Sequence, residues 1–144
     1  MKRVSFQISI GASVERVWEV LWGDDYYQRW FSVFMEGSYA ETDWNEGSKV
    51  LFLTPEGEGM VSTIKIKKPY KHMVFQHLGT VSKGEEDLDN EWAGAIESYT
   101  LESNGGTKLT VEVDTIEKYR EYFEKVWPVA MERIKELAEK EVVE

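Results

Sequence analysis

The sequence contains no cysteine among its 144 residues. Disulfide bonds, thiolate metal sites and cysteine nucleophiles are therefore excluded. Basic residues are outnumbered, since 17 Lys and Arg stand against 27 Asp and Glu and the formal net charge is −10. Nucleic-acid binding needs a basic stripe on the protein surface, and an anionic membrane surface repels an acidic protein. We therefore expect neither a nucleic-acid partner nor membrane insertion.

Long apolar runs are also missing. No window approaches the ~18 apolar residues that span a bilayer. Residues 1–10 alternate polar and apolar side chains, unlike the apolar region of a signal peptide. These features predict a cytoplasmic protein. The composition is globular, with 42% hydrophobic and 13% aromatic residues, and the length suits one domain. We predict a single domain over residues 1–144.

Near the C-terminus, apolar residues recur at spacings of three and four, which is typical of an amphipathic helix. We predict one long helix over residues 115–141. Pro128 lacks a backbone N–H, so we expect a kink near residues 124–127. The apolar stripe of this helix needs a partner, and the natural partner is a sheet. The stripe consists of Ile116, Tyr119, Phe123, Val126, Trp127, Ala130, Ile134 and Leu137.

The N-terminal part predicts a strand followed by two short helices. Residues 4–10 alternate apolar and polar side chains, as a strand with one buried face does. Ser13 suits the N-cap of a first helix over residues 14–22. Asp24 or Asp25 suits the N-cap of a second helix, which continues through an aromatic segment.

From Gly37 onward the pattern is that of strands joined by turns. With the first strand we count about seven, and their short connections predict an antiparallel sheet. The acidic segment 83–90 predicts a loop. The fold class is therefore α+β. The predicted strands of this part are residues 37–42, 49–54, 60–67, 72–81, 92–102 and 107–115.

Several short segments carry a family resemblance. They are residues 10–21 with Trp30 after them, residues 59–61 leading to 68–69 and 73–75, and residues 106–111. In this order they resemble the START-like (SRPBCC) superfamily, and most of all its branch of homologues of the activator of heat-shock-protein ATPase. The resemblance covers the whole chain. It implies the helix-grip fold, in which a curved antiparallel sheet wraps around the long C-terminal helix with two short helices between strands 1 and 2. It also implies a pocket between sheet and helix.

His72 and His77 are the only histidines and stand five residues apart on one predicted strand. An odd separation places them on opposite faces, so they cannot jointly hold a metal ion without a bulge. We predict that His77 faces the helix, because it is in register with Met73 and Phe75. It is then either a core histidine satisfied by a neighbour or a polar group for a ligand in an apolar pocket.

Glu97 is the second polar candidate. If Ala95, Glu97 and Tyr99 face the helix, a carboxylate lies in the concave side of the sheet. It would then need His77, a tyrosine hydroxyl or water as a partner, and it could act as a general base. If Ile96 faces inward instead, Glu97 is a solvated surface charge.

Large rigid side chains are needed to line a pocket, and the elements around the predicted one supply several. Our predicted ligand-binding residues are Trp30, Phe75, His77, Glu97, Tyr99, Phe123 and Trp127. We predict no catalytic residue, no metal site and no cofactor.

Three functions remain open. The first is a domain that binds a small apolar molecule, lipid-like or polyketide-like, in the pocket that the resemblance implies. The second is an enzyme of the cyclase or aromatase type, although no convergent acid–base set is evident and the sequence favours binding over catalysis. The third is a protein-interaction domain that stimulates a chaperone ATPase, as the name of the branch implies. Its partner would be a chaperone or a second copy of the chain.

Overall fold

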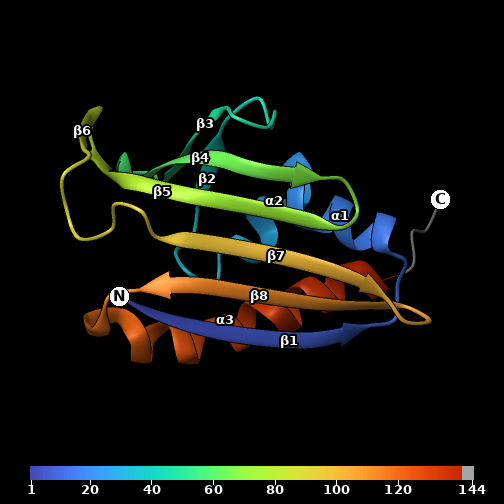
Figure 1. Ribbon diagram of the computed structural model, residues 1–144. Coiled ribbons are helices and arrows are strands. Elements are labelled where there is room, and N and C mark those ends of the chain that lie inside the picture. Colours follow the sequence, from blue (N-terminus) through green and yellow to red (C-terminus); the bar gives the residue numbers. More distant parts are fainter. Residues whose placement is uncertain (141–144) are drawn as a thin grey trace.

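The computed structural model describes residues 1–140, and within them one sheet of eight strands is combined with three helices (Figure 1). A strand comes first, followed by two short helices, seven strands and the long C-terminal helix. This is the predicted α+β helix-grip architecture, with one strand beyond the seven expected. Glu141, the predicted last residue of the C-terminal helix, lies outside the described residues.

All strand pairs of the sheet are antiparallel, as the short connections predicted. The order across the sheet is β1-β8-β7-β5-β4-β3-β2, and β6 is attached to β5. The bounds are β1 Lys2–Ile10, β2 Tyr39–Glu41, β3 Lys49–Leu53, β4 Glu58–Lys68, β5 His72–Ser82, β6 Glu85–Asp87, β7 Ile96–Ser103 and β8 Thr107–Thr115.

The acidic segment contains β6, so the predicted loop is wrong at residues 85–87. Lys83 and Gly84 both have positive φ, at 49° and 85°. Two such residues form the tight turn that matches the twist of a β-hairpin, and glycine takes this conformation without strain. The turn folds the acidic residues back onto the end of β5, where Ser82 pairs with Glu85.

β5 changes its partner along its length. Residues 72–76 pair with β7 and residues 80–82 pair with β6. Between these ladders, the backbone of His77 donates to Ala95 O and accepts from Gly94 N, both at 2.8 Å. The sheet therefore forks at His77, and the connection from β6 to β7 leaves the sheet there. For this reason β7 begins at Ile96, later than predicted.

β4 has two register shifts opposite β5, one of them between Val61 and Ser62. Both residues are fully buried. The register shift, as at a β-bulge, brings Ser62 opposite His77.

The two short helices are α1 (Val14–Trp22) and α2 (Asp24–Phe31). Ser13 caps α1 as predicted, since its hydroxyl accepts from the Arg16 N–H. The predicted cap of α2 is wrong. Gly23 ends α1 and is also the N-cap of α2. The amides of Tyr26 and Tyr27 bond to the Gly23 carbonyl, so the helix already includes both aspartates.

The C-terminal helix α3 spans Glu117–Glu139 and begins two residues later than predicted, because β8 continues to Thr115. Its burial is uneven. From Glu117 to Val126 every side chain is exposed or half-buried, whereas the helix from Trp127 onward carries a fully buried stripe. The first half of α3 thus faces something other than packed core. The buried residues are Trp127, Ala130, Met131, Ile134, Leu137 and Ala138.

The helices lie behind the sheet in the view of Figure 1, and the main core fills the space between these layers. Trp22 of α1 is at its centre. Its ring lies 4.8 Å from the Tyr99 ring and 5.3 Å from the Phe75 ring, both edge-on. Among the described helices, none is long and apolar enough to cross a membrane.

Candidate ligand-binding site

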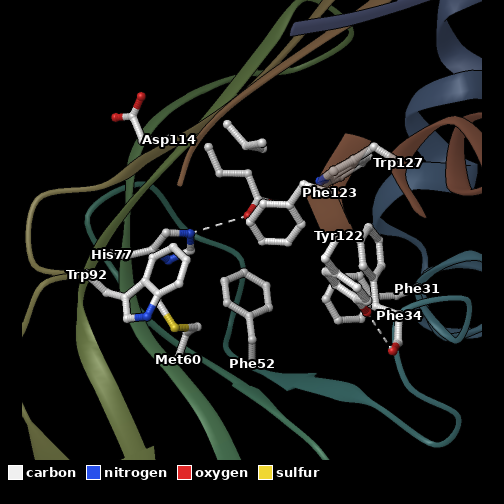
Figure 2. A pocket seen from close by; sticks show the side chains of 12 residues that line it. Phe31, Phe34, Phe52, Met60, His77, Trp92, Asp114, Tyr122, Phe123 and Trp127 are labelled. Atoms are coloured by element: carbon white, nitrogen blue, oxygen red, sulfur yellow. Dashed lines mark hydrogen bonds and ion pairs between the residues drawn. The ribbon is translucent and has the colours of Figure 1, made fainter. Parts of the chain in front are cut away.

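A cavity of about 230 Å³ lies between the sheet and the first half of α3. Figure 2 shows Trp92 and Met60 on one side of it and Phe31 and Phe34 on the other. This space explains why the first half of α3 lacks a buried stripe. The lining residues are Phe31, Phe34, Phe52, Met60, His77, Trp92, Glu97, Val113, Asp114, Tyr122, Phe123 and Trp127.

The structure brings together four of the seven predicted site residues. His77, Glu97, Phe123 and Trp127 line the cavity. The other three lie outside its lining and are fully buried in the core. They are Trp30, Phe75 and Tyr99.

Glu97 is a charged group in this wall, and the inward facing of its strand is confirmed. Ala95 and Tyr99, two residues to either side, are fully buried, so the alternative with Ile96 inward is wrong. The carboxylate Oε1 lies 3.3 Å from His77 Nε2, and Oε2 accepts a hydrogen bond from the Tyr99 hydroxyl. Two of the expected partners therefore compensate the burial of this charge.

His77 faces the cavity as predicted, and both of its ring nitrogens have partners. Nδ1 lies 2.5 Å from the Ser62 hydroxyl, and Nε2 faces Glu97. With Nε2–H donating to the carboxylate, a neutral imidazole accepts from Ser62 at Nδ1. Serine, histidine and glutamate also form hydrolytic triads. Here Ser62 is fully buried and outside the cavity lining, so it cannot attack a ligand.

Tyr99 stays protonated in this network. Burial, together with the charge of Glu97 and the hydrogen bond to it, raises the pKa of the Tyr99 hydroxyl well above its ordinary value. The hydroxyl therefore acts as a fixed donor beneath the cavity. It holds the carboxylate in place from the side of the core.

The chain also matches a known family. A sequence profile of the family described as Activator of Hsp90 ATPase homolog 1-like protein, AHSA1, matches residues 11–139. The chain belongs to this family. The match confirms the branch that the sequence resembles. No curated protein matches the sequence.

Solved structures share the fold of this AHSA1 family member at low sequence identity. Protein MLL2253 from Mesorhizobium loti has a TM-score of 0.73 and 16% identity, with 99% of this chain and 100% of that chain covered. The Aha1 dimer from Colwellia psychrerythraea has a TM-score of 0.73 and 22% identity, with 96% and 97% covered. DynU16, from the dynemicin biosynthetic locus, has a TM-score of 0.71 and 16% identity, with 94% of this chain and 46% of that chain covered.

In this AHSA1 family member the mouth of the cavity is framed by aromatic residues. Trp92, in the turn before β7, is half-buried, and its ring lies 5.7 Å from Tyr119 and 6.5 Å from Phe123. On the other side, the Tyr122 hydroxyl donates to Phe34 O at 3.1 Å (Figure 2). This bond ties α3 to the segment after α2. The fork of the sheet at His77 is what brings Trp92 to the mouth.

Asp114 is the other carboxylate of the cavity wall, and its charge is already compensated by hydrogen-bond donors. Arg3 Nε donates to it at 2.8 Å and the backbone N–H of Ile96 at 2.9 Å. Burial alone would raise the pKa of the Asp114 carboxyl, but these hydrogen bonds outweigh it and lower the pKa below its ordinary value. In Figure 2 the carboxylate points away from the aromatic rings.

Sequence reasoning missed eight of the lining residues. Phe34 lies in an irregular segment, where no periodicity indicates a facing. Phe52 and Met60 are directly opposite each other on β3 and β4, a pairing that the Pro55–Gly59 turn could have suggested. The eight are Phe31, Phe34, Phe52, Met60, Trp92, Val113, Asp114 and Tyr122.

Proposed function

We propose that this AHSA1 family member binds a small, largely apolar molecule in the cavity between the sheet and the first half of α3. The observation that carries the proposal is an aromatic-lined space whose wall contains a half-buried, hydrogen-bonded carboxylate–imidazole pair. Ligand sites in proteins are of this kind, mostly apolar with a few fixed polar groups.

The volume of the cavity limits the ligand. An engineered cavity of about 150 Å³ encloses benzene, so about 230 Å³ suits a compound of one or two rings. A long acyl chain would not fit inside. Of the lipid-like and polyketide-like ligands predicted from the sequence, we therefore favour small ring compounds.

The expected affinity is modest. An aromatic group of this size buries roughly 150–250 Å². At about 25 cal/mol per Å² this corresponds to roughly 4–6 kcal/mol, or a Kd of about 0.04–1 mM before polar contacts are added.

The test is native mass spectrometry of the purified protein, followed by a thermal-shift screen of ring compounds. A ligand at about ten times its Kd stabilises the fold by about 1.4 kcal/mol, which corresponds to roughly 3–6 °C in Tm for a chain of this length. Val113→Phe, which fills the cavity, should abolish the shift. Val129→Phe places the same ring on the exposed side of α3 and should leave the shift unchanged. Equal shifts in both variants would refute binding in this cavity.

A second function is favoured by the convergence of Glu97 and His77 in the cavity wall with Tyr99 behind them, because the sequence alone shows no convergent acid–base set. In this function Glu97 accepts a proton from a bound ring ketone that also carries a hydroxyl group, and the protonated Glu97 returns the proton to another atom of the enolate. Proton NMR would follow exchange of the ketone's α-hydrogens in D₂O. Glu97→Gln should stop exchange above the buffer rate. Equal exchange in the wild type and the variant would rule out this enzyme.

A further inference from the structure

On the basis of the proposed binding function, we infer that the ligand carries a hydrogen-bond donor on its ring skeleton, as a hydroxyl, N–H or ammonium group, and that carboxylate ligands are excluded. The feature that assigns this chemistry is the Glu97 carboxylate, which faces the cavity with hydrogen-bonding capacity to spare.

The charges of the wall favour donors over anions. Within the described residues, no lysine or arginine lines the cavity, whereas Glu97 and Asp114 do. Asp114 is paired with Arg3 at 2.8 Å. Among the ion pairs of the described residues, Glu97 is paired with His77 alone, and its side chain is 17% exposed. A second negative charge in this apolar space would meet a carboxylate that water screens poorly.

Glu97 can accept further hydrogen bonds. An ionised carboxylate offers about four lone-pair sites, and two of them face His77 Nε2 and the Tyr99 hydroxyl. The contact with His77 is long, at 3.3 Å, so a ligand donor can compete for the same oxygen.

The other polar groups of the wall have little to offer a ligand. His77 uses both ring nitrogens, toward Ser62 and Glu97. The Tyr122 hydroxyl donates to Phe34 O. Trp92 is half-buried at the mouth, where water can serve its indole N–H. A ligand that carries only an acceptor therefore faces a carboxylate, and its own acceptor is left without a donor.

The net charge of the chain also favours cationic ligands over anionic ones. The chain has a formal net charge of −10, which raises the local concentration of cations and lowers that of anions. An ammonium group on a two-ring skeleton combines this attraction with a charge-assisted hydrogen bond to Glu97.

Isothermal titration calorimetry with matched two-ring probes tests the inference. The probes are naphthalene, 2-naphthol, 2-methoxynaphthalene, 2-naphthoate and 2-naphthylmethylammonium. A hydrogen bond to a charged group changes affinity by about tenfold to a hundredfold. We expect 2-naphthol to bind about tenfold or more tightly than its methyl ether, because only the hydroxyl donates. The ammonium should bind most tightly and the carboxylate most weakly.

Glu97→Gln removes the charge and should abolish the preference for the ammonium over the carboxylate. Glu102→Gln is the matched control, because Glu102 is exposed near the end of the same strand. If Glu97→Gln does not fold, the wild-type probe series still decides.

The possible results separate this inference from the function on which it rests. If the methyl ether and the carboxylate bind as tightly as 2-naphthol, the donor requirement is refuted while ligand binding stands. If no probe binds, both the proposed function and the inference fail.

Discussion

Because α3 is buried unevenly, truncating a side chain in its first half should cost much less stability than truncating one in its second half. Ile134 lies in the second half and is fully buried. Ile134→Ala should lower the free energy of unfolding by about 2–5 kcal/mol, the usual cost of such a deletion in a packed core. Phe123 lies in the first half, half-buried and against an existing cavity.

A fully packed phenylalanine costs about 3–5 kcal/mol when truncated to alanine. Phe123 lacks neighbours on its cavity side, so fewer contacts are lost. We expect Phe123→Ala to cost about 1 kcal/mol, or roughly 2–4 °C in Tm. Ligand binding should weaken in this variant, because the wall of the cavity is removed.

Urea unfolding followed by tryptophan fluorescence and by circular dichroism measures both costs, provided that the two probes coincide. Tyr119→Ala is a suitable control, since Tyr119 is exposed and lies outside the cavity lining. If Phe123→Ala costs as much as Ile134→Ala, the first half of α3 is packed in solution and the reasoning about the cavity is wrong.

Three further predictions concern polar contacts of the fold. Ser62→Ala leaves a buried nitrogen of His77 without a partner and should cost about 1–3 kcal/mol in urea unfolding, whereas half-buried Ser98→Ala should cost little. Arg16 donates to Leu137 O at 3.1 Å at the end of α3. Arg16→Lys should lower the free energy of unfolding by about 1 kcal/mol, because lysine lacks the guanidinium fork. An unchanged midpoint in urea unfolding would refute this role. Because the pKa of Asp114 is lowered in the folded state, its ionised carboxylate contributes stability above the unfolded pKa of 3.8, and this contribution is lost as pH falls through the folded pKa. Asp114→Asn should therefore reduce the loss of Tm at acidic pH in melting curves recorded across pH.

Period-two and helical patterns predicted the facing of single elements well. The inward facing of His77, and one of the two alternatives for Glu97, followed from alternation along a strand, which backbone geometry imposes. The sequence could not show that these residues meet. Their contact depends on the pairing of β5 with β7, which places Phe75 opposite Glu97.

The alternation of side chains along a strand also does not show how deeply an inward side chain is buried. Phe75 and Tyr99 face the helices as expected, yet they are covered by Trp22 and lie outside the cavity lining. Whether an inward side chain meets packed core or a cavity depends on its neighbours in space. Asp24 and Asp25 were misjudged as caps for a related reason. Gly23 can end one helix and begin the next, so no separate cap residue was needed.

The fork of the sheet at His77 separates two hydrogen-bonded registers. The β5–β7 and β5–β6 ladders are each fixed by their own pairs, and the connection that carries Trp92 lies between them. Residues can be inserted into or deleted from this connection without moving either ladder by one position, so no strand has to turn its side chains over. Grafting a different loop between β6 and β7 is therefore a way to change which ligands the cavity admits, while the polar pair of His77 and Glu97 stays in place.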